Sequence, residues 1–275
     1  MVAKLTKHEL RSYWKTFLPL WGAMLVLAVI NGFTLRTMQD VEGAMGFFTH
    51  VVPLLVLFGM LVATCVLTLV LVLQRFYRGL LGSEGYLAFT LPVSRRQLIA
   101  SKLISSLVVE FLSVLVVCLT FLLLGLVLTE ADIFAGFGEL FTMLRKLFAE
   151  MPRESWMTVL FCVEGLVLTV VGAALGTLHF YAAMSLGHLS GKYRMPLSVV
   201  AYVVLSVAGS WVMTLLGQLG VESGLFRHLE VLMDSSSILK SMTLGMGVAI
   251  LLDLAGAVIL WAVTEYILEK KLNLE

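Results

Sequence analysis

The chain has 275 residues, of which 60% are hydrophobic and 13% are charged, and its formal net charge is +1. Soluble domains are about 45–50% apolar and about 25% charged, so this composition excludes a water-soluble globule, and its apolar content excludes a disordered chain. A charge so close to neutral gives no general attraction to nucleic acid. An all-α polytopic membrane protein remains, and at about 20 residues a span the length allows six spans with short loops.

Six apolar runs are long enough to cross a membrane. They must be helices, because lipid offers no hydrogen-bond partners to open backbone groups. We treat residues 1–275 as a single transmembrane domain, and we see no internal repeat of the kind that many secondary transporters show. The predicted spans are residues 17–35, 51–73, 103–128, 157–183, 196–216 and 242–264.

The basic residues predict which side of the membrane each loop occupies. Of the 19 Lys and Arg residues, 13 lie in the N-terminal segment, in the loops after the second and fourth spans, and after the last span. Basic loops of multi-pass proteins stay in the cytoplasm. Both termini are therefore expected to be cytoplasmic.

Residues 1–16 mix apolar residues, among them Tyr13 and Trp14, with four basic residues. This mixture is typical of an amphipathic helix that lies in the membrane interface, with its aromatic rings at headgroup level. The alternative is a basic anchor that only sets topology, because the positive-inside pattern alone demands some of these charges. We expect an N-terminal interfacial helix over residues 1–16.

A second amphipathic segment, residues 133–148, follows the third span on the outer side. Its apolar residues recur at helical spacing, while Glu139, Arg145 and Lys146 occupy other positions. The pattern predicts an amphipathic helix. This helix either closes the outer end of a transport pathway or rests on the bilayer, and interfacial anchoring explains the pattern unaided.

The inner loop between the second and third spans, residues 75–101, is too long for a tight connection between helices. Ser83 is a possible helix cap with Glu84 in the first turn, and Pro92 then breaks that helix. Ser94 is placed to cap a second helix, with Gln97 three residues on as in a capping box. We expect a short helix, an elbow at Pro92 and a basic helix that runs into the third span. An interfacial hairpin whose arginines bind lipid phosphates would give the same pattern.

Residues 84–102, EGYLAFTLPVSRRQLIASK, resemble the cytoplasmic loop of bacterial type-2 ABC transporter permeases. These are the membrane subunits of the exporter class that includes drug-efflux and bacteriocin-immunity transporters. The matching residues are Glu84, the core Thr90-Leu91-Pro92-Val93-Ser94-Arg95 and the pair Ser101-Lys102. The charged N-terminal helix, the six spans and the ending YILEKKLN are also similar to this family, so the resemblance covers essentially the whole chain. Its specificity rests mainly on residues 84–102, since six spans describe many families.

In that family the loop is a coupling helix, which docks in a groove of a separate ATP-binding subunit. The resemblance implies that Glu84, Tyr86, Pro92, Arg95 and Arg96 form or shape the docking surface. It also implies a second permease copy or a paralogue, and an exporter of a lipid, peptide or drug-like substrate in the bacterial cytoplasmic membrane. The partner ATPase would bind ATP and magnesium, so we expect no cofactor and no catalytic residue in this chain.

The closest local match to a phosphate-binding loop is GHLSGKY, residues 187–193. Its spacing differs from G-x-x-x-x-G-K-[ST], and Tyr193 replaces the hydroxyl residue that would hold magnesium. We interpret this segment as a turn between the fourth and fifth spans.

Three acidic residues fall inside the predicted spans, namely Glu110, Glu164 and Asp253. Acids within a membrane are unfavourable and commonly functional, so each is a candidate for the transport pathway. The alternative for Glu164 and Asp253 is a protonated carboxyl that hydrogen-bonds across helices. Glu110 lies about 10 Å from the inner end of its span, at 1.5 Å per residue, and we favour a local role near the headgroups or the base of the loop.

Two other classes of function stay open. A non-transporting sensor or scaffold subunit can use the same fold, because fold does not fix function. An intramembrane enzyme is less favoured, because the chain has no H-E-x-x-H and no G-x-S-x-G motif. No metal site is expected, since neither the three cysteines nor His179 and His188 have the spacing of metal ligands.

Overall fold

The computed structural model of the chain is all-helical, and no strand occurs among the residues that it describes. The chain divides into two compact units. Unit 1 contains Met1–Gln74 and Ile104–Glu150, and unit 2 contains Arg75–Leu103 and Met151–Glu275. The structure describes residues 2–37, 44–82, 85, 90, 92–128, 138, 141–143, 145–146, 155–190, 193–222 and 238–270.

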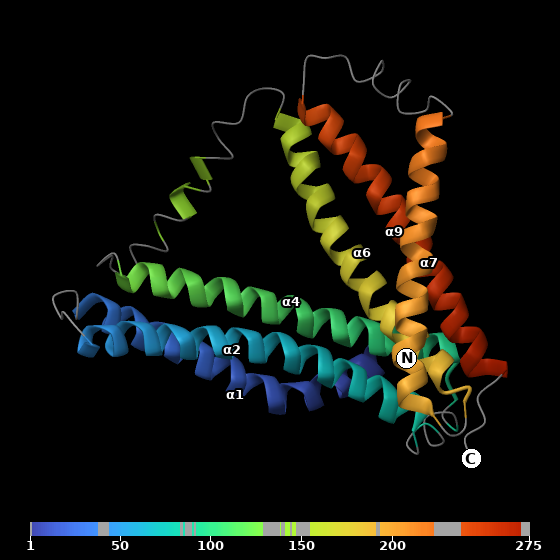
Figure 1. The fold of residues 1–275 in the computed structure, drawn as a ribbon, viewed down its shortest axis with the longest axis horizontal. Coiled ribbons are helices and arrows are strands. Elements are labelled where there is room, and N and C mark those ends of the chain that lie inside the picture. The colour runs from blue at the N-terminus through green and yellow to red at the C-terminus, as the bar shows by residue number, and fades with distance from the viewer. Residues whose placement is uncertain are drawn as a thin grey trace. The chain divides into compact units, whose positions relative to one another are not determined.

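Six long α-helices make up most of the described chain (Figure 1). Each contains a stretch that is long and apolar enough to cross a membrane, as expected of a multi-pass membrane protein. All six predicted spans lie within these helices, so six long apolar helices in this order are confirmed, and their crossing of a membrane stays a prediction. The helices are α1 (Val2–Thr37), α2 (Ala44–Phe76), α4 (Arg95–Leu128), α6 (Ser155–Gly187), α7 (Arg194–Glu222) and α9 (Ile238–Lys270).

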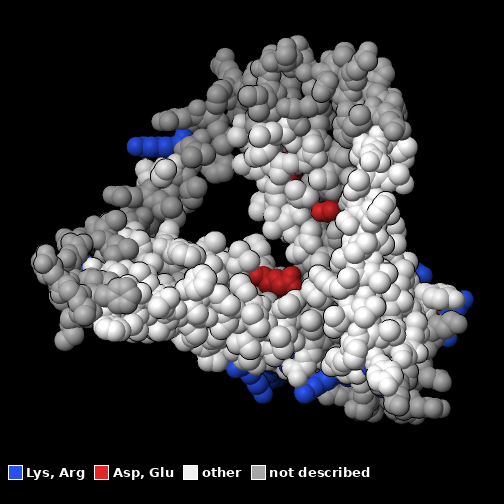
Figure 2. Space-filling model, in the orientation of Figure 1, with Lys and Arg blue, Asp and Glu red and all other residues white. Residues whose placement is uncertain are grey.

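The helices expose large apolar side chains that a soluble protein would bury. Leu166 of α6, Trp211 of α7 and Leu251 of α9 are 65%, 74% and 66% exposed. Most of the described helical surface visible in Figure 2 is uncharged. Such a surface suits a hydrocarbon solvent, in which apolar side chains lose nothing by exposure.

Helix α1 joins two segments that the charge pattern separates, residues 1–16 and the first span. In the structure, residues 2–16 and the first span form one continuous helix of 36 residues, Val2–Thr37. At 1.5 Å per residue this helix is about 54 Å long, longer than the ~30 Å hydrocarbon core of a bilayer. The helical state of the N-terminal segment is thus confirmed, and its place in the membrane interface stays a prediction.

In unit 1, α1, α2 and α4 pack side by side (Figure 1). Hydroxyl and indole groups link the three helices: Trp21 donates to Ser113 Oγ over 3.3 Å, and Ser113 Oγ lies 3.4 Å from Thr68 Oγ1. Interhelical hydrogen bonds and close packing hold helices together in lipid, where the hydrophobic effect does not. The apolar part of this core contains Tyr13, Phe17, Trp21, Val109 and Val116.

In unit 2, α6 packs against α9 and α7. Small residues line the seam between α6 and α9, where a Cβ placed on Gly256 would lie 3.1 Å from Leu175 Cδ1. Close approach at small residues is a common way for membrane helices to associate. Between α6 and α7, the ring of Phe180 stacks on Tyr202, with centroids 4.6 Å apart.

The predicted outer amphipathic helix, residues 133–148, lies mostly outside the described residues. Of it, only 138, 141–143 and 145–146 are described, and these are helical. Phe141 and Met143 are 71% and 65% exposed. Its amphipathic character and its two possible roles stay predictions.

Candidate functional site

The segment that resembles a coupling loop lies within residues 75–103, which belong to unit 2. Helix α2 ends at Phe76 and passes into a π-helical turn, Tyr77–Leu81. Gly82 closes this turn in an extended conformation, and its backbone N–H donates to the Tyr77 carbonyl over 2.7 Å. Short π-helical turns are rare and occur frequently at functional sites.

Buried side chains and a close backbone contact fix the start of the segment. Leu80 and Leu81 are fully or almost fully buried. A Cβ on Gly85 would lie 2.7 Å from the Leu80 carbonyl oxygen, so this position accepts only glycine without a backbone shift. Lys102 reaches back from α4 and donates to the Arg75 carbonyl over 3.3 Å. The two ends of the segment are therefore in contact.

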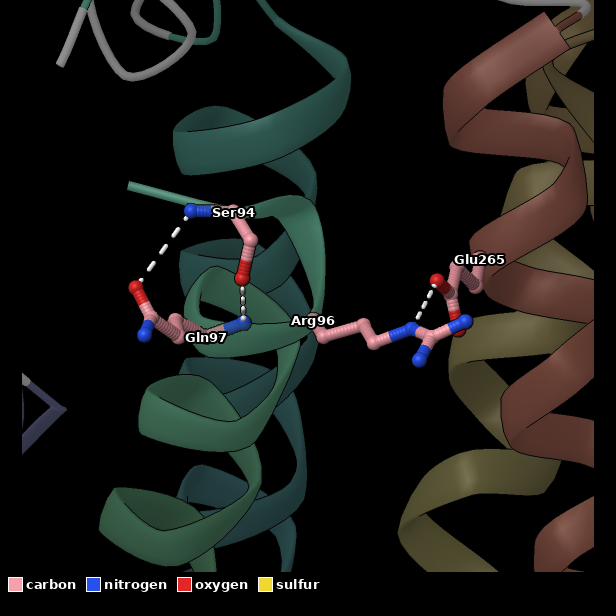
Figure 3. Close-up of polar contacts among 4 residues, drawn as sticks. All are labelled: Ser94, Arg96, Gln97 and Glu265. Atoms are coloured by element: carbon pink, nitrogen blue, oxygen red, sulfur yellow. Dashed lines mark hydrogen bonds and ion pairs between the residues drawn. The ribbon is translucent and has the colours of Figure 1, made fainter. Parts of the chain in front are cut away.

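A capping box starts α4, as the sequence predicted (Figure 3). The backbone N–H of Gln97 donates to Ser94 Oγ over 3.4 Å, and the backbone N–H of Ser94 donates to Gln97 Oε1 over 3.3 Å. The Gln97 N–H also donates to the Ser94 carbonyl over 3.0 Å, so the capping box reinforces that bond, gives the Ser94 N–H a partner and fixes the direction in which α4 leaves the loop.

Arg95 and Arg96, the first two residues of α4, both contact the C-terminal end of α9. Arg95 donates to the Leu268 carbonyl, which is one of the last four carbonyls of a helix that ends at Lys270. Such carbonyls lack a partner within the helix, and the negative end of the helix dipole favours a cation there. The arginine therefore caps α9 from a segment about 170 positions away in the sequence.

Arg96 forms an ion pair with Glu265 of α9, with 2.5 Å between Nε and Oε1 (Figure 3). The arginine side chain is 74% exposed and the glutamate only 17%. The helix dipole disfavours a carboxylate near the C-terminus of a helix, and Glu265 lies near the C-terminus of α9. The positive charge of Arg96 offsets this unfavourable interaction.

Two aromatic contacts join the start of the segment to α6 and to the turn that follows it. The rings of Phe76 and Tyr181 stack with centroids 3.8 Å apart and planes 10° apart, and both side chains are almost completely buried. Tyr77 meets His188 edge to face, with centroids 6.0 Å apart. Burial, followed by the charge of Arg194, lowers the pKa of His188 below its ordinary value. The imidazole is therefore held neutral, with its Nδ1 unpartnered among the described residues.

The structure brings together some of the predicted site residues. Arg95 and Arg96 meet at α9, and the exposed Pro92 precedes them in the same segment. Glu84 and Tyr86 lie outside the described residues. The role of all five residues in docking a partner stays a prediction, because the bonds from the two arginines to α9 are internal to the chain.

The three intramembrane acids lie in different places. Glu110 is partly buried on the α4 part of unit 1. Glu164 of α6 and Asp253 of α9 both face the seam between these helices. Asp253 Oδ2 would lie 3.8 Å from a Cβ on Gly172, and Glu164 Oε1 would lie 3.9 Å from a Cβ on Gly247. Each acid therefore sits against a glycine of the other helix.

Four residues that contact the loop segment were not predicted from the sequence, namely Tyr181, His188, Glu265 and Leu268. Nothing local marks them, because each contact joins positions far apart in the chain. The turn predicted after α6 is confirmed for residues 188–190. Among the described residues, no group of three or more His, Cys, Asp or Glu side chains is placed to hold a metal.

Comparisons of the chain with protein-family models, with curated proteins and with solved structures found no match.

Proposed function

We propose that the chain is the transmembrane permease subunit of an ATP-driven ABC exporter in the bacterial cytoplasmic membrane. A separate ABC ATPase subunit binds ATP and magnesium, and a second permease copy or a paralogue completes the pathway for a lipid, peptide or drug-like substrate. The observation that most supports this function is that side-chain contacts join the segment between α2 and α4 to the ends of both α6 and α9.

A loop that transmits movement from an ATPase to membrane helices must be rigid, because a flexible loop would deform and leave the helices in place. The described ends of this segment are held by the buried π-helical turn and by the capping box. Its contacts then lead to α6 through Phe76 and to α9 through Arg95 and Arg96. A displacement of the segment would move the ends of two membrane helices together, as in the rigid-body and shear movements that switch other proteins.

The positions of Glu164 and Asp253 in the seam between α6 and α9 favour a packing role for both acids. Each acid faces a glycine across a close helix seam, and one oxygen of Glu164 is buried without a partner among the described residues. Acidic residues within a membrane are unfavourable and almost always face the interior of a helix bundle, as these two do. These acids would then respond to movement of α6 against α9, and would not bind substrate directly.

The test is a charge swap at the ion pair between the loop and α9. The variants are Arg96→Glu and the double variant Arg96→Glu/Glu265→Arg, each purified with the ATPase that accompanies the chain. We expect Arg96→Glu to lower substrate-stimulated ATP hydrolysis, because two acids then face each other. The double variant restores the attraction and should recover most of the stimulation.

The outcomes separate three accounts. Recovery in the double variant supports transmission through α9. Loss in both variants would mean that Arg96 acts by docking on the ATPase, as the family resemblance implies. Normal stimulation and normal transport in the single variant would contradict the proposed role of the segment. Assembly with an ATPase but no transport of any substrate class would favour the scaffold or sensor alternative.

A further inference from the structure

The N-terminal part of α1 borders an open groove of about 810 Å³ in unit 1. Its lining residues on α1 recur at three- and four-residue intervals, so they form one stripe of the helix. From residue 2 to residue 14 this stripe runs about 18 Å at 1.5 Å per residue, comparable to one leaflet of a ~30 Å hydrocarbon core. The lining residues are Val2, Ala3, Thr6, Lys7, Leu10, Arg11, Trp14 and Ile104.

The groove combines an apolar floor with two positive charges. Lys7 and Arg11 lie one helical turn apart and are both exposed. In the part of the chain that the structure describes, neither side chain has a hydrogen-bond or ion-pair partner. Like charges one turn apart repel each other, so an anion bound between them would relieve that repulsion.

We propose that this groove binds one anionic phospholipid, with its phosphate between Lys7 and Arg11 and an acyl chain along Leu10, Trp14 and Ile104. Charge complementarity selects the anionic headgroup. The 43% exposed ring of Trp14 suits the boundary between headgroup and acyl chain, where tryptophan is enriched in membrane proteins. The proposal needs only that the chain is embedded in a membrane, and it does not depend on coupling to an ATPase.

The groove differs from a general basic surface in its shape. Its volume falls in the range of about 300–1,000 Å³ that is typical of sites for small ligands. Lys4 and Lys15 are exposed on the same helical segment but do not line the groove. Lys4 and Lys15 would attract anionic lipids to the surface without binding any one of them at a fixed place. Lys7 and Arg11, together with the apolar groove, would bind one lipid molecule at a defined site.

Native mass spectrometry of the full chain in neutral detergent tests the proposal, with dioleoyl phosphatidylglycerol and dioleoyl phosphatidylcholine as the probes. We expect the chain to retain one molecule of phosphatidylglycerol in preference to phosphatidylcholine. The variant Lys7→Gln/Arg11→Gln should bind phosphatidylglycerol roughly 25-fold more weakly, at about fivefold for each charge. The matched variant Lys4→Gln/Lys15→Gln should bind it as the unaltered chain does.

A third variant tests the apolar part. Ile104→Trp fills the part of the groove assigned to the acyl chain but keeps both charges, and it should also lose the retained lipid. The charge-conserving variant Lys7→Arg/Arg11→Lys should keep binding, which separates a lost site from a misfolded chain. Equal binding of the two lipids, or equal weakening in the two neutralised variants, would overturn the proposal in favour of diffuse attraction.

Discussion

The stacked pair Phe76 and Tyr181 gives the sharpest test of the contact between the loop and α6. The rings lie 3.8 Å apart at 10°, and their side chains are 0% and 1% exposed. Truncation of a buried aromatic residue to alanine costs about 3–5 kcal/mol, and the stack itself contributes about 0.5–1.5 kcal/mol. Leucine keeps much of the burial but removes the stack. We therefore expect each single leucine variant to lower the unfolding free energy by about 1–2 kcal/mol.

The assay is a double-mutant cycle on unfolding in mixed micelles, followed by ATP hydrolysis in the complex with the accompanying ATPase. Phe76→Leu/Tyr181→Leu should lose less than the sum of the single variants, by about 0.5–1.5 kcal/mol, because the stack is lost only once. The control is Phe180→Leu/Tyr202→Leu, which removes a stack between α6 and α7. We expect both pairs to weaken the fold, and only the first pair to reduce substrate-stimulated hydrolysis.

Two results would refute this reasoning. Strict additivity at Phe76 and Tyr181 would show that the rings do not stack on each other. Equal loss of stimulated hydrolysis in the control pair would show that general weakening of unit 2, and not the loop contact, reduces the activity.

Three further predictions concern local structure. Ser94→Ala should weaken the start of α4 by about 0.5–2 kcal/mol, because a capping bond is lost, and hydrogen exchange of the first α4 amides should accelerate. Gly187→Ala should lower the thermal unfolding temperature, with a cost of about 1–3 kcal/mol, because its Cβ would lie 2.5 Å from a backbone nitrogen of α7, whereas Gly176→Ala meets nothing within 4 Å and should be tolerated. The pKa of His188 is lowered from the ordinary value of 6.5, so the folded protein favours the neutral imidazole. The stability that this neutral side chain contributes is present above pH 6.5 and is lost as the pH falls through the lowered pKa. The protection factors of amides 77–81, which refer the measured exchange to the slower intrinsic exchange at lower pH, should therefore fall in mild acid, and this fall should be absent in His188→Phe.

Local features of the structure could be predicted from the sequence. The six helices follow from apolar runs long enough to span lipid, and this signal needs no knowledge of tertiary contacts. The capping box depends on two residues three positions apart, so Ser94 and Gln97 were sufficient to predict it. The boundary expected near residue 16 was not a helix end. A change in charge pattern does not end a helix, and both segments favour the same helical backbone.

Long-range features could not be predicted. The arginines at positions 95 and 96 were expected to face a partner, and their contacts with Leu268 and Glu265 depend on how helices distant in sequence pack. Glu164 and Asp253 were recognised as unusual from their position in apolar runs. Their glycine neighbours could be identified only once the relative register of α6 and α9 was known.

One subunit of an ATP-driven exporter should leave its native membrane together with the other subunits. The measurement is a pull-down of the tagged full chain in mild detergent, with mass spectrometry of the bound proteins. We expect a stoichiometric subunit that carries nucleotide-binding motifs, together with a second permease copy or paralogue. A chain that is stable and alone in several mild detergents would contradict it.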